Sequence, residues 1–216
     1  MGHRKTLSDI RREYGQEGLS DEGLLDCPIA QFNVWFDEVL LTEQSDPTAM
    51  VLSTVDAKGN PDSRVVLLKS ADHQGFVFFT NYDSAKAIQI AQHPYVALNL
   101  YWSHLVRQVR IRGRVQKTST TQSDDYFASR PVGSQLSAIV SSQSKVLCSR
   151  AELESTLHEL MVNRKPSDPI VRPAHWGGYV VIPDELEFWQ GRDNRLHDRV
   201  QYRLNQGKWS HRRLAP

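Results

Sequence analysis

Residues 106–115, VRQVRIRGRV, largely alternate apolar and basic side chains. A period of two is typical of a β-strand with one face in a protein core and the other in water. The preceding residues 95–102, YVALNLYW, are rich in aromatic and β-branched types, which favour strands. Only a short gap separates the two stretches, so they have the spacing of neighbouring strands.

Outward from this pair, the same reasoning predicts strands at residues 49–55, 63–69, 76–80, 176–182, 186–190, 200–204 and 209–213. Turn sequences such as DAKGNP (56–61) separate them. Short strands at hairpin-like spacing are typical of a barrel of mainly antiparallel strands.

Helices are predicted at residues 84–92, 122–129 and 150–163, with Ser84 as the cap of the first. A further amphipathic helix begins at Pro28. Its apolar residues recur at helical spacing and are expected in the core: Phe32, Trp35, Phe36, Val39 and Leu40. The fold class is therefore mainly β with peripheral helices.

The chain of 216 residues is 39% hydrophobic and 24% charged, as in an ordinary globular protein. We predict one domain at residues 28–216, preceded by an N-terminal arm at 1–27. A net charge of +1 gives no overall attraction to nucleic acid or to an anionic membrane. No apolar run reaches the length of a membrane span, and the first residues lack a signal-peptide core. We therefore expect a cytoplasmic protein.

Cys27 and Cys148 lack metal-binding spacing and are expected to be reduced thiols. The sequence contains no CxxC, HExxH, GxGxxG or GxxxxGK[ST] motif, so no metal, dinucleotide or P-loop site is predicted.

Three segments place basic or hydroxyl groups at the ends of predicted elements, where phosphate can bind. They contain Arg64 and Lys69; Thr80, Ser84 and Lys86; and Tyr126, Arg130 and Ser134. Each segment taken alone also fits ordinary surface charge.

Residues 185–199, ELEFWQGRDNRLHDR, pass from a predicted strand through a polar turn into a dense charged cluster. Arg195 and Arg199 flank His197, an arrangement that suits an anionic ligand, although a solvated hairpin tip gives the same composition. The basic strand 106–115 also permits a nucleic-acid interface, but no aromatic stacking platform accompanies its arginines.

In order along the chain, these residues resemble the pyridoxine (pyridoxamine) 5'-phosphate oxidase family. The matching pieces are RREY (11–14), DPTAM (46–50), RVVLLK (64–69), RQV (107–109), YFASRP (126–131), SQ (134–135), QS (143–144), WGG (176–178), EFWQG (187–191) and NRLHDR (194–199). EFWQG followed closely by RLHDR is the most specific of them. The resemblance implies an FMN-binding split β-barrel that forms a homodimer with FMN at the subunit interface.

Carried over position by position, the resemblance implies three sets of site residues. The FMN site would comprise Arg64, Val65, Val66, Leu67, Leu68, Lys69, Phe79, Thr80, Lys86, Gln108, Gln143, Ser144, Trp189 and Arg199. The substrate phosphate would be held by Lys69, Tyr126, Arg130 and Ser134. Arg195 and His197 would hold the pyridine ring, and Arg11 and Tyr14 would form a lid over the substrate.

The implied reaction is oxidation of pyridoxamine or pyridoxine 5'-phosphate by O2 to pyridoxal 5'-phosphate, with hydrogen peroxide released, and ammonia too from the amine. Hydride would pass from substrate C4' to flavin N5. The alternative is a non-catalytic split-barrel protein that binds FMN or a phosphorylated vitamer.

The chain departs from the family's Gly-Ser-Arg-Lys where it reads Asp83-Ser84-Ala85-Lys86, and Phe79 stands where Tyr is frequent. Loss of one charged contact costs about 1.5–3 kcal/mol, so we expect weaker FMN binding unless another cation, such as Arg112 or Arg114, compensates.

Overall fold

The computed structural model describes residues 18–165 and 167–216. Arg11, Tyr14 and the expected lid lie outside the described residues. The strands are β1 (Ala49–Val55), β2 (Pro61–Leu67), β3 (Ser70–Asp72), β4 (Gly75–Asn81), β5 (Tyr95–Trp102), β6 (Arg107–Lys117), β7 (Trp176–Gln190), β8 (Asp198–Asn205) and β9 (Lys208–Leu214). The helices are α1 (Pro28–Leu40), α2 (Ala85–Gln92), α3 (Thr120–Ser129), α4 (Val132–Val140) and α5 (Arg150–Asn163), with short 3-10 turns η2 (Asp21–Gly23) and η3 (Asp193–Arg195).

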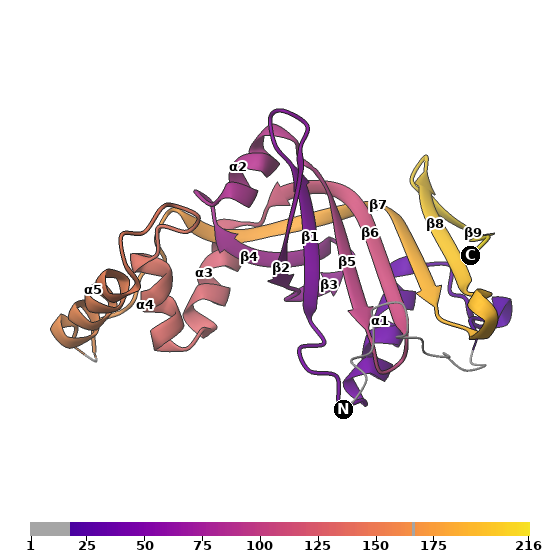
Figure 1. Ribbon diagram of the computed structural model, residues 1–216, viewed down its shortest axis with the longest axis horizontal. Coiled ribbons are helices and arrows are strands. Elements are labelled where there is room, and N and C mark those ends of the chain that lie inside the picture. The colour runs from indigo at the N-terminus through magenta and orange to yellow at the C-terminus, as the bar shows by residue number, and fades with distance from the viewer. Residues whose placement is uncertain (1–17, 166) are drawn as a thin grey trace, which may run out of the picture. The chain divides into compact units, whose positions relative to one another are not determined.

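The strands form one sheet in the order β2-β1-β5-β6-β7-β4-β3, and β8 pairs with both β7 and β9 (Figure 1). The pairs β1–β2, β3–β4, β4–β7, β7–β8 and β8–β9 are antiparallel. The mainly β fold class is confirmed. The alternation predicted around β6 is also confirmed, because Val109, Ile111 and Val115 are buried while Arg110 and Arg114 are exposed.

Contacts divide the chain into two compact units. Of the described residues, the α1 unit comprises 18–47, 99–111 and 184–216, and the β4 unit comprises 48–98, 112–165 and 167–183. Strands β5, β6 and β7 contribute residues to both units.

In the α1 unit, the aromatic stripe of α1 forms the core, as predicted. Phe32 and Trp35 are almost fully buried, and Trp35 packs edge-on against Phe188 with ring centroids 5.1 Å apart. Phe188 in turn contacts Tyr202 of β8 in a T-shaped arrangement. The expectation for Leu40 is wrong: the residue is 55% exposed, because it faces away from the side of the helix that carries the buried Phe32, Trp35 and Val39.

In the β4 unit, β4 is buried along nearly its whole length, and β2 is largely exposed. Phe76 and Phe78 are fully buried, and Phe78 contacts Tyr179 of β7. Helices α3, α4 and α5 follow one another after β6, and α4 contacts α5.

Three local predictions need correction. Residues 176–182 and 186–190 belong to one continuous strand, β7, because Pro183 remains extended within it. No helix was predicted at Val132–Val140, where α4 lies; Pro131 stands at its N-cap and so separates it from α3. Ser84 is the N-cap of α2 but makes no capping bond among the described residues, because its hydroxyl donates to the Asn81 carbonyl.

No described helix has both the length and the apolar character needed to cross a membrane. Cys27 and Cys148 are both free and exposed.

Candidate functional site

A pocket of about 510 Å³ lies within the β4 unit, and four cationic side chains line it: Arg64, Lys69, Lys86 and Arg130. The other lining residues are Val65, Val66, Leu67, Phe79, Thr80, Tyr126, Pro131, Ser134, Gln143 and Trp176. No carboxylate is among these described lining residues. We call this cavity the cationic pocket. It brings together most of the residues that the sequence predicted from three separate segments.

Lys86 enters the pocket from the first turn of α2 and is buried there. Its Nζ donates to Gln143 Oε1 at 2.6 Å and to the hydroxyls of Thr80 and Ser84 at 3.3 Å. Burial, and secondly the charge of Arg64, lower the pKa of Lys86 to about 8. An ammonium held only by neutral oxygens in a partly dry site favours an anionic ligand, because an anion offsets its lost hydration.

Arg64 of β2 is held in place by a network at the edge of the pocket. Its Nη1 donates to Thr54 Oγ1 at 2.5 Å and to the Leu52 carbonyl at 3.2 Å. Its Nη2 contacts Asp62 at 2.5 Å and Gln89 at 3.1 Å. Arg64 is therefore partly neutralised and oriented before any ligand arrives.

Arg130 lies at the junction of α3 and α4, where Gln135 Nε2 donates to its carbonyl at 2.7 Å. Its guanidinium carbon lies over the ring of Trp176, 4.6 Å from the centroid. Its Nη1 is buried and has no hydrogen-bond partner among the described residues. Desolvation lowers the pKa of Arg130, although an arginine stays charged at any physiological pH. A buried charged donor without a partner is rare and marks a binding position for an acceptor.

Aromatic rings form one wall of the pocket. Phe79 stacks on Tyr126 with ring centroids 3.9 Å apart and on Trp176 at 5.5 Å. The backbone of β7 approaches this wall closely: a Cβ at Gly178 would lie 2.8 Å from the Phe79 ring and 2.4 Å from Thr118 Oγ1. The WGG sequence is therefore needed here for its lack of side chains as well as for its tryptophan.

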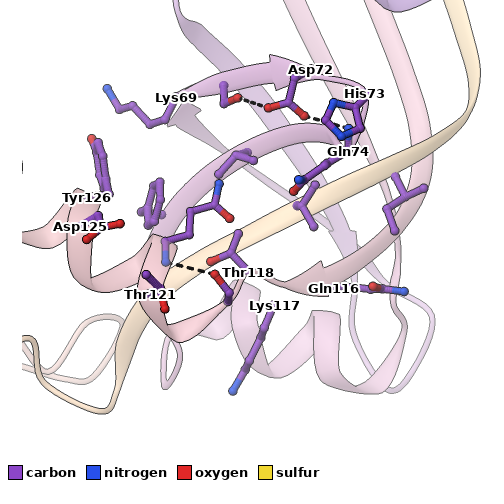
Figure 2. Close-up of a pocket in the computed structure, with 17 residues that line it drawn as sticks. Lys69, Asp72, His73, Gln74, Gln116, Lys117, Thr118, Thr121, Asp125 and Tyr126 are labelled. Atoms are coloured by element: carbon purple, nitrogen blue, oxygen red, sulfur yellow. Dashed lines mark hydrogen bonds between the residues drawn. The ribbon is translucent and has the colours of Figure 1, made fainter.

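A larger groove of about 1010 Å³ adjoins the cationic pocket and shares Lys69, Phe79 and Tyr126 with it. Figure 2 shows Lys69 and Tyr126 at one end and Gln116 and His73 toward the other. Its lining mixes bases with the carboxylates of Asp72 and Asp125. The smaller cavity, whose charged lining residues are all cations, is the better anion site.

In the α1 unit, the turn of residues 193–197 and the first residues of β8 carry the other predicted cluster. Asn194 and Arg195 both have positive φ, 56° and 63°. Arginine rarely adopts this conformation, and strained turns concentrate at functional sites. The side chain of Arg195 is exposed, so the strained backbone presents a cation at the surface.

His197 follows in the same turn, and its ring lies 4.7 Å from the Trp189 ring. Its Nδ1 accepts a hydrogen bond from the Arg192 amide at 3.0 Å, so the neutral ring carries its proton on Nε2. Burial, and then the charge of Arg195, lower the pKa of His197. At neutral pH the ring is thus an Nε2–H donor.

Arg199 was predicted to contact FMN, and much of its side chain is engaged within the α1 unit. Its Nε donates to Glu187 Oε1 at 2.9 Å and its Nη1 to the Ala215 carbonyl. Glu187 is buried and also receives Arg110 at 3.1 Å. This carboxylate raises the pKa of Arg199 and fixes its position. Gln108, another predicted contact, is half-buried on β6.

The remaining predicted residues fall outside the pocket lining. Leu68 is buried, and Ser144 lines a separate cavity of about 440 Å³ with φ at 71°. Asp83 lines a small cavity of about 120 Å³, and Ala85 is exposed at the start of α2. Trp176, buried in the pocket wall, received no role from the sequence, since a ring beneath an arginine 46 residues away along the chain leaves no local pattern.

The mainly antiparallel sheet and the cationic pocket define a mainly β protein whose site suits an anionic ligand. The chain belongs to the pyridoxamine 5'-phosphate oxidase family. The family model described as "Pyridoxamine 5'-phosphate oxidase" matches residues 36–162. The model described as "Pyridoxine 5'-phosphate oxidase C-terminal dimerisation region" matches residues 176–216. The expected resemblance is thereby confirmed.

Curated relatives cover all or nearly all of the chain. The pyridoxine/pyridoxamine 5'-phosphate oxidase of Legionella pneumophila (strain Lens) is 59% identical over 216 residues, 100% of both chains. The enzyme of the same name from Pseudomonas syringae pv. tomato is 49% identical over 98% of this chain and 99% of its own.

Among solved structures, PhzG from Burkholderia lata, in complex with tetrahydrophenazine-1-carboxylic acid, superposes with a TM-score of 0.85. It is 27% identical and covers 90% of this chain and 95% of its own. A pyridoxamine 5'-phosphate oxidase-related, FMN-binding protein from Nostoc punctiforme gives a TM-score of 0.70 at 18% identity, over 89% of this chain and 100% of its own. The second likeness supports the split-barrel fold.

Proposed function

We propose that this protein is an FMN-dependent oxidase that converts pyridoxamine 5'-phosphate and pyridoxine 5'-phosphate to pyridoxal 5'-phosphate, in vitamin B6 biosynthesis or salvage. The overall reaction of the amine consumes O2 and water and releases hydrogen peroxide and ammonia. The full-length relatives at 59% and 49% identity are both named pyridoxine/pyridoxamine 5'-phosphate oxidase.

The observation that supports the proposal most directly is the Nη1 of Arg130, which has no hydrogen-bond partner among the described residues and lies in a pocket whose charged lining residues are all cations. A phosphate ester supplies the acceptor oxygens that this donor lacks. Lys69, Tyr126 and Ser134 line the same pocket and add an ammonium and two hydroxyls. These four side chains are proposed to hold the substrate phosphate.

The same pocket also fits the phosphate of FMN. Lys86, Thr80 and Arg64 line it, and α2, the helix that carries Lys86, begins without a side-chain cap. The amides and the positive dipole end of a helix start favour an anion. Residues 65–69, Phe79, Gln143 and Ser144 are proposed to complete the cofactor site, together with Gln108, Trp189 and Arg199. The arginine missing at Ala85 leaves this site one cation short of the family pattern.

Arg195 and His197 are proposed to hold the substrate ring. An exposed guanidinium and an imidazole that donates from Nε2 can bind the polar edge of a pyridine ring. When bound, FMN would accept two electrons from the substrate and would then be reoxidised by O2. The chain's own contribution is to fix the phosphate, orient the ring and exclude water.

We further propose that the chain forms a homodimer with FMN at its interface, works in the cytoplasm, and uses Arg11 and Tyr14 as a lid. The C-terminal match to a dimerisation region supports the homodimer. No nucleic-acid role is proposed, because the arginines of β6 are not interleaved with stacking rings.

The test is oxygen uptake with pyridoxamine 5'-phosphate, with and without added FMN. Uptake that rises with added FMN supports the oxidase and locates a weakness at the cofactor phosphate. No uptake at saturating FMN would refute it and favour a binding protein for FMN or a phosphorylated vitamer.

A further inference from the structure

We propose that Trp176 is a positioning residue of the reaction: its ring holds the Arg130 guanidinium in place for the substrate phosphate. This inference rests on the proposed function and deepens it. Neither the sequence pattern nor the family matches gave Trp176 a role.

The contact between the two side chains is suited to this task. The guanidinium carbon lies 4.6 Å from the centre of the Trp176 ring and 5.8 Å from that of Phe127. A ring attracts a cation through its negatively charged face. Unlike a carboxylate, it neither neutralises the charge nor accepts the N–H groups through an oxygen. The arginine is thus oriented while its Nη1 remains without an acceptor among the described residues.

Trp176 is itself held on several sides. Its amide donates to the Pro173 carbonyl at 3.0 Å, and its carbonyl accepts from Arg172 Nη1 at 2.5 Å. Arg172 also pairs with Asp124 of α3 at 2.6 Å. The ring packs edge-on against Phe127, with centroids 5.3 Å apart.

This arrangement links both ends of the Arg130 side chain to α3. Arg130 directly follows α3, and Trp176 is tied to α3 through Asp124 and Phe127. Binding of phosphate therefore requires little further ordering of the arginine, which lowers the entropic cost of the contact. Loss of the ring should weaken phosphate binding and leave the chemical step at saturating substrate nearly unchanged.

The experiment compares Trp176→Leu, Trp176→Phe and Trp176→Tyr with wild type in steady-state oxidation of pyridoxamine 5'-phosphate at saturating FMN. We expect Trp176→Leu to raise KM roughly 5- to 30-fold, with kcat within about twofold of wild type. Trp176→Phe and Trp176→Tyr keep a ring and should restore most of the affinity. If the Trp176→Leu variant does not fold, the Trp176→Phe and Trp176→Tyr variants are used in its place. Trp209→Leu, a tryptophan of β9 in the other unit, is the matched control.

Two further readouts separate positioning from general damage. The dissociation constant of pyridoxal 5'-phosphate on the FMN-loaded enzyme, from equilibrium dialysis, should rise by the same factor as KM. In a double-mutant cycle, Trp176→Leu should have little additional effect once Arg130 is replaced by Ala. Unchanged binding in Trp176→Leu, or full additivity with Arg130→Ala, would overturn the inference.

The failure of the proposed function looks different. A wild-type protein that takes up no oxygen refutes the oxidase, while the dialysis measurement still tests whether Trp176 supports phosphate binding.

Discussion

Arginines of the α1 unit are mostly neutralised by carboxylates, whereas the key cations of the pocket in the β4 unit contact neutral groups. Among the described residues of the α1 unit, the ion pairs are Arg107–Glu38, Arg110–Glu187, Arg199–Glu187, Arg203–Glu185, Arg192–Asp198, Arg213–Asp21 and Arg213–Asp198. In the pocket, Lys86 contacts an amide and two hydroxyls, and Arg130 contacts rings. Arg64, paired with Asp62, is the exception.

The difference separates two uses of positive charge. An arginine paired with a carboxylate has its charge satisfied and contributes to structure. A buried cation held by neutral groups keeps its charge for a ligand, and its burial makes the attraction stronger than it would be in water. Arg195 is a third case, because it is exposed, on strained backbone, and without an ion pair among the described residues.

The largest expected effect tests this third case. Arg195→Ala should lower kcat with pyridoxamine 5'-phosphate by roughly 100-fold or more, since it removes a group proposed to orient the substrate. Bound flavin, read from its absorbance after gel filtration, should be retained. Arg150→Ala on the surface of α5 is the control. A variant that simply loses FMN would show that Arg195 belongs to the cofactor site.

Lys86→Met tests the unneutralised cations of the pocket. Loss of a charge-assisted contact should weaken FMN binding about 10- to 150-fold, measured by quenching of flavin fluorescence. Lys117→Met removes a lysine that lies over the Tyr82 ring and lines the larger groove instead. Equal effects of the two changes would mean that position in the pocket does not matter.

Ala85→Arg is the converse of Lys86→Met, because it adds a cation at the start of α2 instead of removing one from the pocket. We expect FMN to bind about tenfold tighter, as one charge-assisted hydrogen bond is gained. Ala57→Arg adds the same charge in an exposed turn and should change FMN affinity little. If Ala85→Arg has no effect, another group already occupies this role.

The pH dependence of FMN binding tests the charge of Lys86 without a substitution at this residue. Its pKa in the ligand-free protein is about 8, and an anion favours the protonated form. FMN affinity should therefore change little between about pH 7 and 8, where the FMN phosphate is dianionic, and fall by up to about tenfold per pH unit above pH 8. The lowered pKa also means that the folded, ligand-free protein gains stability as pH rises from about 8 toward 10.5. In the Lys86→Met variant, FMN affinity should not begin to fall at about pH 8.

The smallest effect concerns the strain at Arg195. Its φ of 63° suits glycine, so Arg195→Gly should be about 1 kcal/mol more stable to urea than Arg195→Ala. Both variants should turn over slowly. Equal midpoints of urea unfolding for Arg195→Gly and Arg195→Ala would indicate that the turn relaxes when the arginine side chain is removed.

Strand alternation and the spacing of turns were enough to predict the mainly β fold and most of its strands. The short β3 was missed, since three residues, SAD, carry no period, and β7 was split at Pro183 because proline usually interrupts a strand. The exposed position of Leu40 depends on where α1 meets the rest of its unit, which helical spacing alone does not give.

The site was predictable to the extent that its residues lie at element ends within recognisable motifs. Charge pairing was not predictable: nothing in the local sequence indicates that Arg199 is bound by Glu187 while Arg130 lies over Trp176. Such partners come from strands or helices distant in sequence. They determine which of many arginines can bind a ligand.

The α1 unit is discontinuous in the chain, and this affects how the protein folds as it is synthesised. Tyr202 of β8 donates to the Leu25 carbonyl across 177 residues, and Trp35 packs against Phe188. The aromatic face of α1 therefore emerges from the ribosome long before its partners. The residues of the β4 unit all precede residue 184, so they are synthesised before Phe188 and Tyr202 can cover this face. Slow translation or early release would leave this aromatic helix exposed, which makes aggregation of truncated chains the expected failure.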